Sequence, residues 1–126
     1  MINRITTIDI EAYLDKKNKF IPFAIGIFNK KIGKKIFLKD ENNVNHNVIA
    51  ECFDYIWKNR KTYNDMIFYA HNLSKFDSYL ILENIAEYGY RIELIKDDSN
   101  GIISATIIKD GFKIKLQDSI KMLNGS

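Results

Sequence analysis

The spacing of the apolar residues changes along this chain in an order that admits few folds. Three segments typical of β-strands come first, of which the second is largely apolar. A helix, a short apolar strand, a second helix and three more strands follow. The expected strands are residues 4–13, 20–29, 34–39, 66–70, 91–96, 102–109 and 112–117, and the expected helices are residues 47–58 and 76–88. This order predicts an α/β fold in which helices pack against one mixed sheet.

Glycines mark the expected turns. Gly33 lies between the second and third strands, and Gly89 follows the second helix, where a left-handed residue commonly ends a helix. Asp110 and Gly111 form the dipeptide that is typical of a tight β-hairpin. The 126 residues contain no repeat and no low-complexity linker, which predicts one domain or part of one.

The composition excludes several classes of protein. A single cysteine, Cys52, allows neither an internal disulfide nor a zinc site built on cysteines. No apolar stretch is long enough to span a membrane, and the acidic first residues fit neither a secretory nor a mitochondrial import signal. The net charge of +3 permits contact with phosphate without requiring it.

Residues 8–11, Ile-Asp-Ile-Glu, place two carboxylates at alternate positions of an apolar segment. On a strand Asp9 and Glu11 lie on the same face, about 6.6 Å apart along the backbone. Like charges this close repel, and a divalent cation such as Mg²⁺ relieves the repulsion. The alternative is that the two carboxylates form the solvated face of an edge strand.

Residues 71–77, His-Asn-Leu-Ser-Lys-Phe-Asp, lie where a strand is expected to lead into a helix. If the strand at 66–70 is parallel to the first one, its end brings Asn72 and Asp77 to the same rim as Asp9 and Glu11. The alternative is a capping box, in which Ser74 caps the helix and Asp77 favours its dipole. Four lysines at 30, 31, 34 and 35 cluster near a hairpin tip and are expected to keep it soluble.

Three segments together resemble the proofreading DNA polymerases. Residues 8–11 resemble their first exonuclease motif, Asp-x-Glu, and residues 71–77 resemble the second, Asn-x(2–3)-Phe/Tyr-Asp. Residues 116–123, Leu-Gln-Asp-Ser-Ile-Lys-Met-Leu, resemble a further segment of the protein-primed family B polymerases of phages and linear mitochondrial plasmids. The resemblance covers nearly the whole chain, in order.

The resemblance implies a ribonuclease H-like 3′–5′ exonuclease domain over residues 1–126 that hydrolyses phosphodiesters with two metal ions. Asp9, Glu11 and Asp77 would hold the two Mg²⁺ or Mn²⁺ ions. The residues that would contact the single-stranded 3′ end are His71, Asn72, Phe76, Ser119 and Ile120.

The implied setting is DNA replication in an organelle. The resemblance implies DNA as the partner, with a terminal protein as primer, and no membrane. The richness in Ile, Lys and Asn, whose codons are A/T-rich, points to an organellar or plasmid gene. A mitochondrial location is therefore expected, and it would remove the need for an import signal.

The chain departs from the family pattern in two ways. None of the seven Tyr has an Asp four residues on, so the third motif, Tyr-x-x-x-Asp, is missing. Ala12 also stands where many relatives carry a hydroxyl. The chain thus resembles the N-terminal part of a larger polymerase, C-terminally incomplete and inactive by itself.

Two alternatives remain open. A stand-alone nuclease of the same fold would need a fourth carboxylate from Asp97, Asp98, Asp110 or Asp118, of which Asp118 fits best. The other alternative is a catalytically inactive fragment that binds single-stranded nucleic acid.

Overall fold

The computed structural model describes residues 5–70, 76–96 and 102–118, with the side chains of residues 76–79 and 102–103 outside the description. No helix in these ranges is long and apolar enough to cross a membrane. The strands are β1 (Ile5–Leu14), β2 (Phe20–Asn29), β3 (Gly33–Leu38), β4 (Ile67–Ala70), β5 (Arg91–Lys96), β6 (Ile102–Lys109) and β7 (Phe112–Asp118). The helices are α1 (Val48–Lys58), α2 (Arg60–Tyr63) and α3 (Phe76–Ile85), with a 3₁₀ turn η2 (Ala86–Tyr88).

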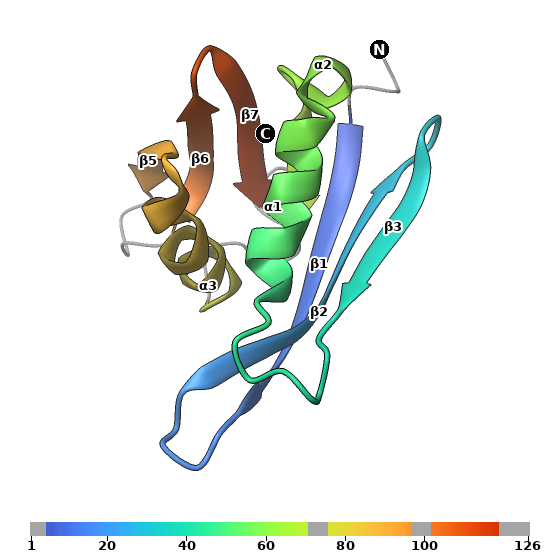
Figure 1. Ribbon diagram of the computed structural model, residues 1–126. Coiled ribbons are helices and arrows are strands. Elements are labelled where there is room, and N and C mark those ends of the chain that lie inside the picture. Colours follow the sequence, from blue (N-terminus) through green and yellow to red (C-terminus); the bar gives the residue numbers. More distant parts are fainter. Residues whose placement is uncertain (1–4, 71–75, 97–101, 119–126) are drawn as a thin grey trace.

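The strands form one mixed sheet in the order β3-β2-β1-β4-β7-β6-β5 (Figure 1). The two outer groups are antiparallel meanders, and the central strands β1, β4 and β7 are parallel. The mixed α/β fold and the parallel pairing of β1 with β4 were both expected from the sequence, and both are confirmed.

The core lies between the sheet and the two longer helices, which Figure 1 shows on one side of the sheet. From the sheet, Ile8, Ile25 and Phe68 contribute fully or almost fully buried side chains to it. The Phe37 ring meets the Tyr55 ring of α1 at a centroid distance of 5.6 Å. This face of the sheet therefore packs against the helices and forms the core.

Asn47 starts α1. Its Oδ1 accepts hydrogen bonds from the backbone N–H groups of Ile49 and Ala50, and its Nδ2 donates to Oδ1 of Asn84 on α3. The side chain thus caps α1 and joins it to α3.

We expect Asn47→Ala to lower the free energy of unfolding by about 0.5–2 kcal/mol, because the first-turn N–H groups of α1 lose their acceptor. Urea denaturation followed by circular dichroism measures the change. Asn42→Ala, in the exposed loop before α1, is the matched control and should change stability little. Equal effects of the two variants would contradict the capping role.

The structure departs from the expected elements at two places. The second helix was expected to run to Tyr88, but it ends at Ile85 and a 3₁₀ turn completes the segment. The short helix α2 was not expected at all. The glycine signals were right: Gly89 has φ 86°, and the hairpin residues Asp110 and Gly111 have φ 46° and 83°.

The lysines near the β2–β3 turn do not share one role. Lys35 Nζ lies 5.3 Å from the ring centroid of Tyr55 and 5.7 Å from that of Phe37, on the side that α1 covers. Lys34, its neighbour along the strand, faces the other way. The solubility role expected for all four lysines is therefore incomplete, since Lys35 also packs on aromatic rings.

Candidate functional site

Asp9 and Glu11 lie on the exposed face of β1. Ile8 on the same strand is buried and Ile10 is half-buried, so the carboxylates face away from α1. This confirms that the two carboxylates share one face. β1 pairs with β2 along its length and with β4 over residues 5–8, so Asp9 and Glu11 themselves pair with β2 alone, and the alternative of a solvated strand face stays open.

The strands next to β1 set the surroundings of this pair. Three rows of residues run across the exposed face of β1, β2 and β3, and each row is fixed by strand register. The rows are Thr7–Phe28–Lys34, Asp9–Gly26–Ile36 and Glu11–Ala24–Leu38. All of these residues except Leu38 line a hollow of about 300 Å³, which we call the β1–β3 groove. Its β1 wall carries Asp9 and Glu11, its β2 floor carries Ala24 and Gly26 with Phe28 at one end, and its β3 wall carries Ile36 and Lys34.

The third expected ligand is Asp77. It is the second residue of α3, so it lies in the first turn of that helix, as predicted. α3 covers the same side of the sheet as α1, whereas Asp9 and Glu11 face away from α1. The side chain of Asp77 lies outside the description, so its convergence with Asp9 and Glu11 at the rim of the sheet stays a prediction. The same holds for the side chain of Phe76. The remaining predicted contacts with a single strand, His71, Asn72, Ser119 and Ile120, fall outside the described residues.

Asp118, the residue considered as a fourth carboxylate, lies on the other face of the sheet. It ends β7, pairs with Ala70 of β4, and is only 3% exposed. Ala70 in turn pairs with Ile8, whose side chain is buried on the helix-covered face. Asp118 is thus directed away from the face that carries Asp9 and Glu11.

A metal site is incomplete among the described side chains. Within that part of the chain, no group of three or more His, Cys, Asp or Glu residues is placed to hold an ion. Asp9 and Glu11 provide two carboxylates of suitable chemistry, since Mg²⁺ and Mn²⁺ prefer oxygen ligands.

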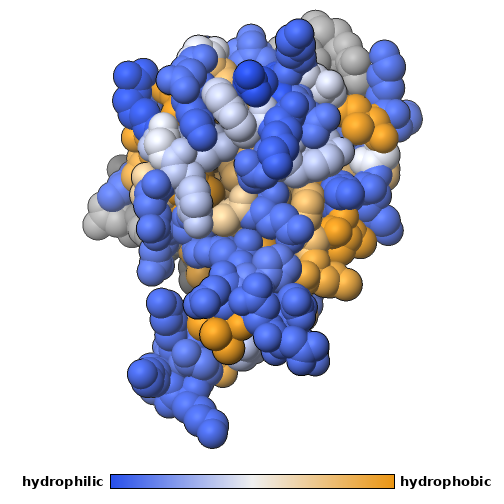
Figure 2. Space-filling view, in the orientation of Figure 1, coloured by the Kyte–Doolittle hydropathy of each residue, from blue (hydrophilic) through white to orange (hydrophobic). Residues whose placement is uncertain are grey.

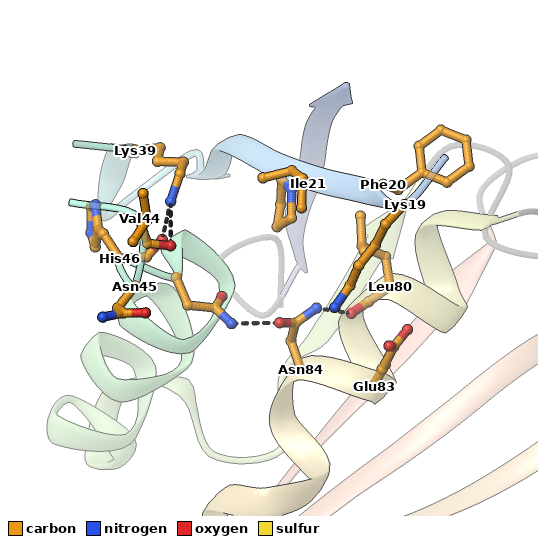
Figure 3. A pocket seen from close by; sticks show the side chains of 12 residues that line it. Lys19, Phe20, Ile21, Lys39, Val44, Asn45, His46, Leu80, Glu83 and Asn84 are labelled. Atoms are coloured by element: carbon orange, nitrogen blue, oxygen red, sulfur yellow. Dashed lines mark hydrogen bonds between the residues drawn. The ribbon is translucent and has the colours of Figure 1, made fainter. Parts of the chain in front are cut away.

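A second hollow of about 360 Å³ lies between the start of β2, the loop before α1, and α3 (Figure 3). Lys39 Nζ donates there to the backbone oxygens of Asn43, Val44 and His46, and the amides of Asn47 and Asn84 bond each other. These polar groups join the loop to α3 and order it. We therefore interpret this hollow as a structural junction.

Cys52 has no nucleophilic role in the fold. It is fully buried in α1, and burial, with a smaller contribution from Glu51, raises the pKa of its thiol to about 12. The thiolate, which is the reactive form, is therefore suppressed at neutral pH.

No protein-family model matches this chain. Three curated relatives carry the name probable DNA polymerase. They come from Agaricus bitorquis (31% identical over 95% of this chain), Ascobolus immersus (29% over 99%) and Podospora anserina (26% over 91%). The chain spans only 17%, 10% and 10% of the lengths of these relatives.

A solved structure has the same fold. It is the family B DNA polymerase from the hyperthermophilic archaeon Pyrobaculum calidifontis, with a TM-score of 0.50 and 16% identity over 68% of this chain and 11% of that one. The chain is related in sequence to part of these probable DNA polymerases and shares its fold with a region of a family B enzyme. The expected fold class, with its mixed sheet and flanking helices, thereby matches a region of such a polymerase.

Sequence reasoning found the carboxylate pair of this polymerase-related chain but missed the groove beside it. The signal was Gly26, a glycine inside the otherwise bulky strand segment 20–29. A glycine in the interior of a strand often marks a bulge or the close approach of a ligand. The register that places Gly26 opposite Asp9 is visible only in the folded sheet.

Proposed function

We propose that this chain is the 3′–5′ exonuclease part of a family B DNA polymerase of the protein-primed type. The observation that carries the proposal is the pair Asp9 and Glu11, which lies exposed on a central strand of a chain related to such polymerases. The relationship suggests DNA as the substrate, and the carboxylate pair supplies ion-binding chemistry.

The residues present fit a divalent ion. Asp9 and Glu11 are exposed, lie on one face, and border a hollow large enough to admit a ligand. Bound Mg²⁺ or Mn²⁺ would supply activation of a water molecule and stabilisation of the leaving 3′ oxygen. The protein would contribute the position of these ions through Asp9, Glu11 and, as the third ligand, Asp77.

Other residues would hold the strand. Phe76 would stack on a base or sugar of the single-stranded 3′ end, and His71 and Asn72 would orient it. Ser119 and Ile120 would contact the strand further from the cut. These roles rest on the motifs in the sequence.

A stand-alone nuclease is the weaker reading. It requires a fourth carboxylate beside Asp9 and Glu11, and Asp118, the best-fitting candidate by sequence, lies on the opposite sheet face. We therefore propose that the fourth carboxylate belongs to a Tyr-x-x-x-Asp segment of a longer polymerase chain. From the resemblance to protein-primed polymerases we also propose a terminal protein as primer partner and a mitochondrial location.

We expect Mn²⁺ to raise the melting temperature of the 126-residue chain. An ion that binds only the folded state stabilises it, by about 2.7 kcal/mol when the ion is at a hundred times its dissociation constant. Asp9→Asn should abolish this shift. Without metal, the variant should be as stable as the wild type or slightly more so, because one of two neighbouring charges is removed. Differential scanning calorimetry with and without Mn²⁺ measures both effects.

Glu41→Gln is the matched control, because Glu41 is an exposed carboxylate in the loop before α1. It should leave the shift caused by Mn²⁺ unchanged. A marked loss of metal-free stability in Asp9→Asn would instead mean that Asp9 is structural. Binding of oligothymidylate that requires neither Mn²⁺ nor Asp9 would favour the nucleic-acid-binding alternative.

A further inference from the structure

A hollow of about 310 Å³ lies on the helix-covered side of the molecule, between α1, η2 and the end of β6. We call it the α1–β6 hollow. The side chains that give it its chemistry are Glu51, Asp54, Trp57, Tyr88, Tyr90 and Lys109. It has no part in the proposed function, because Asp9 and Glu11 lie on the other face of the sheet.

The surface around this hollow is polar. Figure 2 shows the helix-covered side of the molecule as largely hydrophilic. Tyr88 is 50% exposed and is the most accessible aromatic ring of the α1–β6 hollow. A ligand here is therefore recognised through aromatic rings and a few charged groups, and not through a broad apolar patch.

The rings of the hollow already hold a cation of this chain. Lys109 Nζ lies 4.6 Å from the ring centroid of Trp57 and 5.0 Å from that of Tyr90. The guanidinium carbon of Arg60 lies 4.3 Å from the centroid of Trp57, outside the hollow. The face of an aromatic ring attracts positive charge. Both contacts therefore show that the rings are arranged to favour a cation.

Lys109 is an incomplete partner for this hollow. None of the ion pairs between described side chains includes Lys109, although Glu51 and Asp54 line the same hollow. Glu51 Oε1 lies 2.8 Å from His46 Nε2, and Asp54 Oδ2 lies 2.9 Å from Lys58 Nζ. Exposed pairs of this kind contribute little to stability, so both carboxylates are free to bind another cation.

Asp54 is the carboxylate that acts on the rings. Burial raises the pKa of Tyr90 to about 12, and the negative charge of Asp54 contributes to the rise. The Tyr90 hydroxyl donates a hydrogen bond of 3.1 Å to the Phe53 carbonyl oxygen, which fixes the ring. A carboxylate whose field reaches this ring also favours a positive charge placed beside it.

We propose that the α1–β6 hollow is a docking site for an arginine side chain on an extended segment of a partner protein. The guanidinium displaces the ammonium of Lys109, stacks on the rings of Trp57 and Tyr88, and pairs with Asp54. Lys109 turns out to solvent on its flexible stem. Arginine competes well with lysine here because its planar group is less strongly hydrated, stacks on aromatic faces and bonds a carboxylate with two parallel hydrogen bonds.

A protein partner fits this arrangement better than a nucleotide. Tryptophan, tyrosine and arginine are the side chains that most often dominate the binding energy of protein interfaces. A nucleotide would stack on the rings and use Lys109 for its phosphate. However, two carboxylates line the hollow against one lysine, and they repel a phosphate. A nucleotide is one outcome of the test.

The fluorescence of Trp57 reports directly on the hollow, because it is the only tryptophan of the chain. The probe is the peptide acetyl-Gly-Ser-Arg-Ser-Gly-amide, and the same peptide with citrulline in place of arginine is the uncharged control. We expect a saturable change in fluorescence with the arginine peptide and none with the citrulline peptide. Deoxythymidine monophosphate, added in the same way, should cause no saturable change.

Two variants with opposite effects make the test decisive. Asp54→Asn should weaken binding of the arginine peptide at least fivefold, because the guanidinium loses its carboxylate. Lys109→Gln should strengthen binding about threefold or more, because the competing ammonium is gone. Glu41→Gln and Lys115→Gln change exposed charges outside the hollow and should leave the affinity unchanged. The melting temperature of each variant shows that it is folded.

The inference is wrong if the monophosphate binds and Lys109→Gln weakens that binding, since the hollow would then hold a nucleotide. It is also wrong if the folded wild type binds neither probe, or if Lys109→Gln leaves the affinity for the arginine peptide unchanged. Loss of peptide binding in a chain continued beyond residue 126, measured by isothermal titration calorimetry, would mean that another part of the same chain fills the hollow, which also contradicts a partner protein.

Discussion

We expect Asp77→Ala to remove 3′–5′ degradation of single-stranded DNA almost completely in a chain that carries all three exonuclease motifs. Such a chain can be made by continuing residues 1–126 with a Tyr-x-x-x-Asp segment. We expect a loss on the order of a thousandfold, about 4 kcal/mol in transition-state stabilisation, because one ligand of the two-ion site disappears. Release of nucleotides from an end-labelled oligonucleotide in Mg²⁺ measures the rate.

The 126-residue chain provides the comparison, since it should degrade the same oligonucleotide little or not at all. Asp118→Asn is the control variant in the continued chain and should retain most of the activity, because Asp118 lies on the opposite sheet face. Strong Mg²⁺-dependent digestion by the short chain that is lost in Asp118→Asn would establish a stand-alone nuclease and overturn the proposal.

The second large effect concerns the core. Phe68 in β4 is completely buried, and its ring lies 5.8 Å from the ring of Tyr63. We expect Phe68→Ala to lower the free energy of unfolding by about 3–5 kcal/mol through the loss of apolar burial and the cavity left behind. Since domains are typically stable by about 5–15 kcal/mol, this variant should be partly unfolded near body temperature. Urea denaturation measures the loss.

Phe28→Ala is the matched control, because it removes the same side chain from the exposed face of the same sheet. Its effect on stability should be well below that of Phe68→Ala. Comparable losses would mean that the β1–β3 groove is covered in solution by a second copy or by another segment, and the exposure described for Phe28 would be wrong.

The sequence was sufficient to predict most of the strands because their alternation is strong. It also placed Asp9 and Glu11 on one face, since two-residue periodicity decides that without any tertiary information. The parallel pairing of β1 with β4 could be stated only as an assumption. Which distant strands pair, and in which register, depends on packing that a single sequence does not show.

The remainder of the site was harder to predict for physical reasons. The position of Gly26 across from Asp9 depends on the β1–β2 register, which a bulge near Ala12 shifts by one residue. The orientation of Asp118 follows from two strand pairings. Asp118 pairs with Ala70, and Ala70 pairs with Ile8, whose side chain is buried. Short elements such as α2 are set by tertiary contacts, so local propensity does not reveal them.

The position of β4 has a consequence for how the chain folds. This strand has only four residues, yet among the described strands it is the one that pairs with both the β1–β2–β3 meander and the β5–β6–β7 meander. Each meander is built from local hairpins, which form quickly, whereas joining them requires contacts between segments at opposite ends of the sequence. Docking of two preformed halves onto β4 should therefore limit the folding rate, and during synthesis we expect the sheet to stay divided until β7 has left the ribosome.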